Sequence, residues 1–244
     1  MKNVFVFVPS FRGTISGLLF ETSHRLMSAF MARGIAASIA TYSWHDISEI
    51  RNMVLSVWYD TMPGSSHILF LEDDMGFAPE LVMDMMEFDE PVVGAIYPKR
   101  TSPRIWCGSG IESPAFSQGF MQVDAVGGGC LLIRRDAVTK LLEKFPQQVG
   151  EYMVLDDMKA SGAKRTLRFF DHIWTDEGKA SEDTSFCWRW REAGGEVWAS
   201  TAYEIQHVGP WIFSGCFAKE KNAENALKAP ITEQEVESEL RRSY

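Results

Sequence analysis

The stretch that decides the fold is HILFLEDDMGFAP, at residues 67–79. Its four apolar residues, 68–71, run directly into three carboxylates, Glu72, Asp73 and Asp74. A short, unbroken apolar run predicts a strand that is buried on both faces of a sheet. Three carboxylates at its end would repel one another unless a cation lay among them.

The acidic triplet favours a divalent cation that holds a diphosphate. Mg²⁺ and Mn²⁺ bind carboxylate oxygens together with the phosphate oxygens of a substrate, and ligands of open α/β sheets bind at the carboxyl ends of strands. Asp74, at the tip, is the expected metal ligand, whereas Glu72 and Asp73 are candidates for the metal or for a ribose hydroxyl. An acidic turn that caps a helix starting near Pro79 would explain the same residues without a metal.

The composition limits the class of protein. The chain has 244 residues, of which 45% are apolar and 23% charged, which is typical of one α/β domain with or without an appendage. A net charge of −9 argues against a broad nucleic-acid-binding surface, although the basic pairs at 99–100, 134–135 and 164–165 remain candidate anion contacts. Four widely spaced cysteines fit a reducing compartment. The first apolar run is too short for a signal peptide or a membrane span, so we expect a cytoplasmic protein.

Strands and helices alternate in the first hundred residues. This alternation predicts a doubly wound, mostly parallel sheet. The expected strands are 4–8, 35–41, 68–71 and 91–97, and the expected helices are 16–33, 47–59 and 79–88.

The pattern changes after residue 98. Residues 98–122 are rich in Ser, Gly and Pro and contain no clear helix, and the polar segment 146–181 is typical of a lid or a binding loop. The residues after 219 predict a solvated helix or a partly disordered tail. The remaining expected strands are 123–126, 130–133 and 196–199, and the expected helices are 136–145 and 182–193.

Further candidate site residues follow in the second half. In SEDTSFCWRW, Ser181 is a candidate N-cap, and Glu182 and Asp183 occupy the first helical turn. Helix capping alone would explain both acids, but a carboxylate after a long loop also suits a general base that meets an incoming hydroxyl. His207, in IQHVG, is either a structural histidine or a ligand that completes the metal shell begun by Asp74.

Three other features have two interpretations each. Arg51, which precedes Asn52, is either a surface charge or a group that reaches a nucleotide. The glycines at 127–129 allow a ligand or another backbone to approach closely, but they match neither a dinucleotide fingerprint nor a P-loop. The tryptophans at 188, 190 and 211 belong either to the core or to a surface that stacks on sugar rings.

Taken in order, these motifs resemble those of the GT-A glycosyltransferases, nearest to family-2-like bacterial and viral members. The resemblance covers about residues 3–212. It rests on ISEIRN followed by ILFLEDDMGFAPELV, on VVGAIYPKR followed by VGGGCLLIRRDAV, and on SEDTSFCWRWREAGGEVW followed by IQHVG. It implies a GT-A-like α/β fold, with a doubly wound, mostly parallel (mixed) central sheet flanked by helices. It also implies one catalytic domain, 1–218, with a nucleotide-binding half (1–100) and an acceptor-binding half (101–218), followed by a charged tail, 219–244.

The resemblance also implies an activity. We expect a metal-dependent, inverting glycosyltransferase of the hexosyltransferase class. It would move a sugar from a nucleoside-diphosphate sugar to a glycan or another hydroxyl acceptor, with no membrane span and no nucleic-acid partner. Retention of configuration remains compatible with the sequence. The implied nucleotide-binding residues are Pro9, Ser10, Arg51 and Asp73; the implied ligands of Mn²⁺ or Mg²⁺ are Asp74, His207 and Glu72; the implied base is Asp183, with Glu182 as the substitute.

The sequence departs from the family pattern in two places. The acidic triplet begins with Glu72 rather than Asp. Residues 41–43 also lack the Asp that often contacts the nucleobase of the donor, and Asp46 is its nearest replacement. Two alternative functions remain. A nucleotidyltransferase shares the sheet and the metal, although only Arg12 and Gly13 represent its phosphate-binding loop, and a nucleotide- or carbohydrate-binding module would lack turnover.

Overall fold

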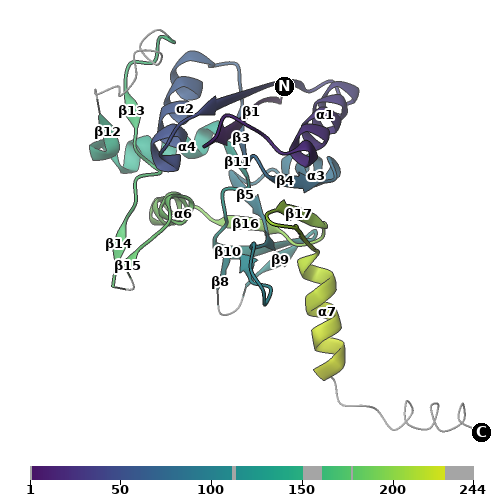
Figure 1. Cartoon of the computed structure of the whole chain (residues 1–244). Helices are drawn as coiled ribbons and strands as arrows, with labels where there is room; N and C mark the ends of the chain where they lie inside the picture. Colours follow the sequence, from purple (N-terminus) through teal and green to yellow (C-terminus); the bar gives the residue numbers. More distant parts are fainter. Residues whose placement is uncertain (1, 112–113, 151–160, 177, 229–244) are drawn as a thin grey trace, which may run out of the picture.

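The computed structural model describes residues 2–111, 114–150, 161–176 and 178–228. Within them, nine strands form a mixed central sheet with helices on both faces (Figure 1), which confirms the predicted α/β class. Along the sheet the strands are β2 (Ala36–Ser43), β1 (Asn3–Ser10), β3 (His67–Leu71), β11 (Cys130–Arg134), β5 (Val92–Ala95), β16 (Val197–Ser200), β10 (Phe120–Ala125) and β8 (Ser109–Gly110), with β9 (Phe116–Ser117) also paired to β10.

The sheet combines parallel and antiparallel pairs. Strands β1, β2 and β3 run parallel to one another, and β16 runs parallel to β5. Strand β11 lies between β3 and β5 and is antiparallel to both, and β10 is antiparallel to β16. The chain passes from β1 to β2 on one side and later to β3 on the other, so the strand order reverses between β1 and β3. The acidic triplet after β3 therefore lies at a switch point of the kind where open α/β sheets bind ligands.

Residues of the central strands alternate between two cores. Phe5, Phe7 and Phe70 face one side of the sheet, whereas Val6 and Leu69 face the other. Because both faces are covered, the strands read as continuous apolar runs. Helices α2 (Ile47–Thr61), α4 (Arg135–Lys144) and α6 (Glu182–Glu192) cover the first side, and α1 (Gly17–Ala32) and α3 (Glu80–Phe88) cover the second.

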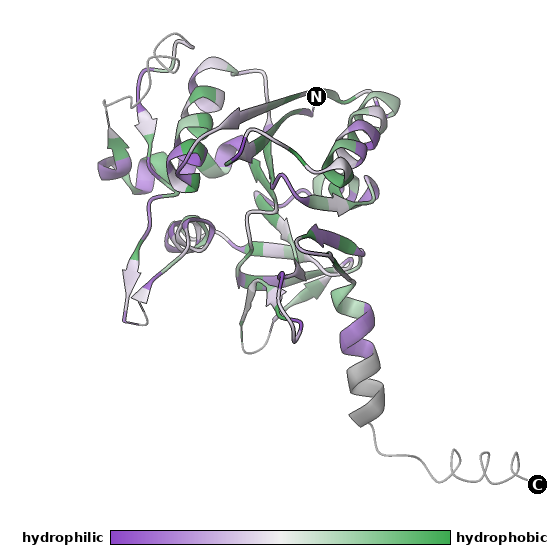
Figure 2. Ribbon diagram, in the orientation of Figure 1, coloured by the Kyte–Doolittle hydropathy of each residue, from purple (hydrophilic) through white to green (hydrophobic). Residues whose placement is uncertain are grey.

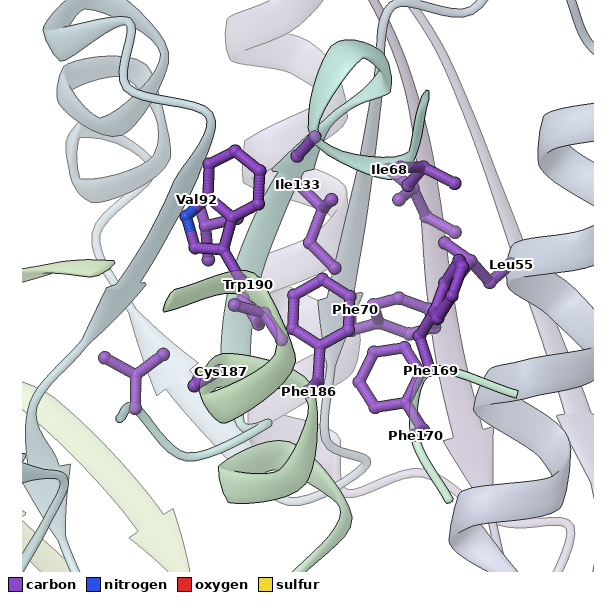
Figure 3. Close-up of a cluster of buried hydrophobic side chains, with 14 of the residues drawn as sticks. Leu55, Ile68, Phe70, Val92, Ile133, Phe169, Phe170, Phe186, Cys187 and Trp190 are labelled. Atoms are coloured by element: carbon purple, nitrogen blue, oxygen red, sulfur yellow. The ribbon is translucent and has the colours of Figure 1, made fainter. Parts of the chain in front are cut away.

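The first core is rich in aromatic rings. Phe70 of β3 and Phe186 of α6 both contact Phe170, edge-on at 5.4 Å and stacked at 4.7 Å between ring centroids (Figure 3). Such pairs add to the free energy of apolar burial. In Figure 2 hydrophobic residues are frequent in the central strands, and the helices carry both hydrophobic and hydrophilic residues. This packing fixes α2 and α6, which carry the candidate site residues Arg51 and Asp183.

A second, smaller sheet was not predicted. It joins β4 (Met75–Phe77), which follows the acidic triplet, to β17 (Ile205–Val208) and β18 (Ile212–Gly215). His207 lies within β17. The predicted helix near Pro79 exists as α3. Three further short pairs are β6 (Tyr97–Pro98) with β7 (Trp106–Cys107), β12 (Val149–Gly150) with β13 (Thr166–Leu167), and β14 (Trp174–Thr175) with β15 (Gly178–Lys179).

The remaining elements lie at the edges of this framework. A single 3-10 turn, Pro146–Gln148, follows α4, and α7 (Phe217–Lys228) projects away from the sheet (Figure 1). The predicted loop 146–181 contains the two hairpin pairs β12–β13 and β14–β15, while its residues 151–160 and 177, like 229–244 of the tail, lie outside the described residues. All four cysteines are free thiols. No helix in the described ranges has the length and apolar character needed to cross a bilayer.

Candidate functional site

A cleft of about 740 Å³ opens at the carboxyl ends of β1, β2 and β3. Pro9 and Ser10, which end β1, form part of its wall together with the whole acidic triplet. Its volume falls within the range of small-molecule sites, about 300–1,000 Å³. The remaining lining residues are Phe11, Arg12, Thr14, Ile15, Ser16, Trp44, His45, Ile47, Ile50, Arg100 and Val208.

Glu72, Asp74 and His207 meet at one side of this cleft. Each offers one ligand atom, and these atoms lie within 4.8 Å of one another. Nε2 of His207 is 3.3 Å from Oδ1 of Asp74 and 3.9 Å from Oε2 of Glu72. Two carboxylates and an imidazole form a donor set that suits Mn²⁺. The structure therefore brings together the three residues predicted as metal ligands.

The orientation of the His207 ring fits a metal ligand. Nδ1 lies 3.0 Å from the carbonyl oxygen of Pro98, so it carries the proton and donates it to that oxygen. In the neutral ring this leaves the lone pair of Nε2 pointing at the carboxylates, the arrangement in which an outer hydrogen bond fixes a metal-binding histidine. Among the described residues, Nε2 is buried and has no hydrogen-bond partner. An unpartnered buried nitrogen beside two carboxylates fits a cation between them.

The small sheet places His207 beside Asp74. In its register, His207 lies opposite Met75, the residue that follows Asp74. The backbone N–H of Val208 donates to the carbonyl oxygen of Asp74 at 2.8 Å. Tyr97 packs edge-on against the imidazole, with 5.5 Å between ring centroids. The two ligands are thus joined by backbone pairing, and their separation does not depend on side-chain contacts alone.

Burial and neighbouring charges shift the pKa values of the groups in this cluster. Burial raises the pKa of Glu72 against the lowering effect of Arg51, and the neighbouring Asp74 raises it further. Burial also raises the pKa of Asp73, again with Asp74 adding to the effect. Burial lowers the pKa of His207, but its contacts with Asp74, Pro98 and Glu72 outweigh this effect, and the net shift is upward. Burial is the largest contribution for all three groups, and the crowded negative charge that adds to the upward shifts is what a divalent cation would relieve.

Arg51 lies inside the protein behind this cluster. Its side chain has no exposed surface, and its guanidinium donates to Oε1 of Glu182 at 2.6 Å and reaches Oε1 of Glu72 at 3.5 Å. The rings of Phe70 and Phe170 flank it, each 5.9 Å from the guanidinium carbon. A direct contact between Arg51 and a nucleotide stays a prediction; in this structure the side chain holds two carboxylates of the site in place.

The three glycines at 127–129 are required by close packing. A methyl group at Gly128 would lie 2.1 Å from both terminal nitrogens of Arg51, and methyl groups at Gly127 and Gly129 would overlap the ring of Tyr97. The sequence predicted the approach of a ligand or another backbone, whereas the groups that lie against the glycines are the side chains of Arg51 and Tyr97. The N–H of Gly129 also donates to the hydroxyl of Tyr97 at 3.0 Å.

Asp183 lies on the other side of the glycine segment. Its Oδ2 accepts the N–H of Gly128 at 2.9 Å, while its Oδ1 accepts the hydroxyl of Ser181 and the N–H of Thr184. Asp183 lines a separate cavity of about 180 Å³ with Lys99, Cys107 and Ser181. The N–H of Glu72 donates to the carbonyl oxygen of Gly129 at 3.2 Å, so the glycine segment is hydrogen-bonded to both the predicted base and the acidic triplet. Asp183 nevertheless lines a different cavity from that of Glu72 and Asp74.

Other candidate residues have structural partners. The carboxylate of Asp46 caps α2 and accepts hydrogen bonds from the backbone of Ser48 and Glu49. The residue predicted as a replacement contact to the nucleobase is therefore a helix cap in this structure. Asn52 donates to Asp171 and accepts the N–H of Phe170. Trp190 is buried, whereas Trp188 and Trp211 are partly exposed.

The basic pairs also separate into two groups. Arg134 binds Asp136, Arg135 donates to backbone carbonyl groups at the end of α2 and just beyond it, and Arg165 binds Asp60. Only the pair at 99–100 lies at the described cavities, with Lys99 in the smaller one and Arg100 in the cleft. Arg100 was predicted only as a possible anion contact, and Tyr97 was given no role. Both lie in VVGAIYPKR, a motif that supports the resemblance as a whole without assigning a function to either side chain.

Comparisons with known proteins show similar architectures but no family. The sequence matches no protein-family model and no curated protein. Among solved structures, the A197 protein from STIV is 17% identical, with a TM-score of 0.48 and coverage of 86% of each chain. Drosophila β-1,4-galactosyltransferase 7, solved with manganese, UDP-Gal and xylobiose, is 14% identical, with a TM-score of 0.45; the match covers 81% of this chain and 64% of that one.

A third similar structure is a glycosyltransferase involved in the glycosylation of the major capsid of PBCV-1. It is 10% identical, with a TM-score of 0.34, and the match covers 58% of this chain and 66% of that one. All of these identities and TM-scores are low. The chemistry of the site is therefore inferred from the side chains of this chain.

Proposed function

We propose that the protein is a metal-dependent glycosyltransferase with a GT-A-like site, which transfers a sugar from a nucleoside-diphosphate sugar to an acceptor hydroxyl. The observation that carries this proposal is Nε2 of His207, which is buried without a hydrogen-bond partner beside Glu72 and Asp74, two carboxylates that line a nucleotide-sized cleft. Pro9, Ser10 and Asp73 line the same cleft and would border the nucleotide. Glu72, Asp74 and His207 would hold Mn²⁺ or Mg²⁺, which neutralises the departing diphosphate.

Asp183 is the proposed general base. Of the two neighbouring acids, Glu182 is tied to the buried Arg51 by an ion pair of 2.6 Å, whereas Asp183 opens into its own cavity. Oδ2 of Asp183 accepts one hydrogen bond from Gly128, and a carboxylate oxygen retains capacity for a second. That capacity allows it to take the proton of an acceptor hydroxyl.

The transfer would proceed with inversion. The acceptor oxygen forms a bond to the anomeric carbon while the bond from that carbon to the diphosphate breaks, and the hydroxyl proton goes to Asp183. In that reaction the acceptor hydroxyl, near Asp183, and the diphosphate, in the larger cleft, would lie on opposite faces of the same sugar ring. A base on the side opposite to the leaving group is the arrangement that inversion requires.

The test uses thermal stabilisation and product analysis together. UDP-, GDP-, CDP- and dTDP-sugars are added with and without Mn²⁺, and a ligand that binds only the native state raises the melting temperature. We expect one donor class to stabilise the protein only with Mn²⁺, and the Asp74→Asn and His207→Ala variants to lose this effect. Equal stabilisation without metal, or none with any donor, would contradict the proposal.

One observation favours a second candidate, a nucleotidyltransferase. Arg12, in the loop after β1, lines the cleft, where an enzyme of that class places basic groups against a triphosphate. The products distinguish the two reactions, since a glycosyltransferase releases a nucleoside diphosphate and a nucleotidyltransferase releases pyrophosphate. Slow hydrolysis of a sugar nucleotide would in turn separate the transferase from a binding module without turnover.

A further inference from the structure

The carboxylate of Asp74 contacts Arg100 with one oxygen and the metal-binding cluster with the other. Nη1 of Arg100 donates to Oδ2 of Asp74 at 2.6 Å, while Oδ1 of the same carboxylate faces Nε2 of His207 at 3.3 Å. The positive charge of Arg100 therefore lies on one oxygen of Asp74, and the other oxygen points to the position expected for the metal.

The side chain of Arg100 is more exposed to solvent than that of Arg51, the buried arginine behind the cluster. Arg51 has no exposed surface, whereas 51% of the Arg100 side chain is exposed. Among the described residues, Asp74 is the partner of its guanidinium, and Arg100 lines the cleft. Because the Arg100 side chain is half exposed, solvent screens part of its attraction to the less exposed Asp74, which lowers the cost of exchanging Asp74 for another partner.

The backbone around Arg100 is anchored, so that a change of partner needs only side-chain rotation. Tyr97 and Cys107 pair in the β6–β7 hairpin, and the N–H of Lys99 donates to the carbonyl oxygen of Ile105 at 2.7 Å. The stem of Arg100 packs over Gly209, where a methyl group would lie 3.2 Å from its Cδ. The glycine that follows His207 in IQHVG thus leaves room for this side chain.

We propose that Arg100 is the counter-ion of Asp74 in the metal-free protein and the diphosphate-binding arginine once metal and donor are present. A divalent cation among Glu72, Asp74 and His207 repels the guanidinium. A diphosphate in the cleft offers it oxygens that match its planar donor fork. The inference rests on the proposed function, because it takes the cleft as a diphosphate site.

The test measures two affinities by isothermal titration calorimetry, Mn²⁺ alone and then inorganic pyrophosphate at saturating Mn²⁺. Pyrophosphate supplies the diphosphate without a base. In Arg100→Ala, Mn²⁺ affinity should rise by about tenfold, because a positive charge a few ångströms away is removed. Pyrophosphate affinity should fall by about tenfold to a hundredfold, the range for losing a hydrogen bond to a charged group.

Two further variants control the experiment. Arg100→Lys keeps the charge, so Mn²⁺ affinity should stay near that of the wild type while pyrophosphate binding weakens, because lysine lacks the planar fork. Arg104 lies in the same β6–β7 segment but pairs with Glu220, so Arg104→Ala should change neither affinity. A melting curve for each variant establishes that it is folded.

The outcomes separate this inference from the proposed function. If the wild type binds no Mn²⁺, both the metal site and the role of Arg100 are overturned. If the wild type binds Mn²⁺ but pyrophosphate affinity is unchanged in Arg100→Ala, only the role of Arg100 is rejected. Weaker Mn²⁺ binding by Arg100→Ala would also reject it, because Arg100 would then support the metal site.

Discussion

Arg51 and Glu182 form an ion pair of 2.6 Å between α2 and α6. The guanidinium is fully buried and also reaches Glu72 at 3.5 Å. One arginine therefore connects a predicted metal ligand to the residue that precedes the predicted base. A buried charge of this kind fixes geometry more than it adds stability, because its desolvation offsets most of the attraction.

The first prediction concerns removal of this arginine. In Arg51→Met, Glu72 and Glu182 lose their shared cation, and breaking a buried ion pair costs about 3–5 kcal/mol. Urea denaturation should show a loss of this size in the free energy of unfolding. The double variant Arg51→Met with Glu182→Gln should recover part of it, since one unpaired charge is removed. A single variant as stable as the wild type would contradict the role given to Arg51.

The second prediction concerns the glycine that contacts the guanidinium. Gly128→Ala places a methyl group 2.1 Å from both terminal nitrogens of Arg51, which must move. Overpacking of a core costs about 1–3 kcal/mol, and chemical denaturation should report a loss in that range. Gly17→Ala is the matched control, because nothing lies within 4 Å of a methyl group at Gly17. Equal stabilities of the two variants would show that the packing at Gly128 is loose.

The third prediction assigns the proton acceptor. Asp183→Asn keeps an oxygen for the N–H of Gly128 but cannot act as a base at neutral pH. With a donor and an acceptor identified, kcat should fall by about 10²- to 10⁴-fold, while calorimetry with Mn²⁺ and donor should give affinities near the wild type. Glu182→Gln should retain most of the turnover. The reverse pattern would transfer the role of base to Glu182.

The fourth prediction is a loss of stability in acid that arises from His67. Burial, with smaller contributions from Lys2 and Arg134, lowers the pKa of this imidazole from 6.5 to about 4. The unfolded chain therefore binds a proton between pH 6.5 and 4 that the native protein does not, so stability falls as the pH falls. From pH 6.5 to pH 5 the loss should be about 2 kcal/mol.

Urea denaturation of the wild type and of His67→Gln at both pH values measures this contribution. The variant is expected to be less stable at pH 6.5, because it disturbs a buried position in β3. Its stability should nevertheless change less on acidification than that of the wild type. An identical decrease in both proteins would mean that other groups cause the acid sensitivity.

The main sheet was largely predictable from the sequence, because its signals are local. The continuous apolar runs at 4–8 and 68–71 correspond to β1 and β3. The helical spacing of apolar residues in 47–59 corresponds to α2. The antiparallel placement of β11 between β3 and β5 was not predictable. Its own residues specify a buried strand, and the direction of a strand depends on contacts with distant segments.

The sequence predicted which residues belong to the site better than it predicted how they are arranged. Glu72, Asp74 and His207 were named from their motifs and lie together in the structure. The burial of Arg51 was not foreseen, because a charged residue on a helix gives no local sign of a buried partner such as Glu182. The short strand β4 was also missed, since Met75–Phe77 becomes a strand only by pairing with β17.

That pairing also has a consequence for the order in which the molecule is assembled. More than half of the chain lies between Asp74 and His207, and contacts between such distant segments close large loops at a cost in entropy. A polypeptide emerging from the ribosome has made the β3 carboxylates long before it contains the imidazole. Metal binding by Glu72, Asp74 and His207, if the proposal holds, would therefore require a chain synthesised at least as far as His207, and it would report on a late step of folding.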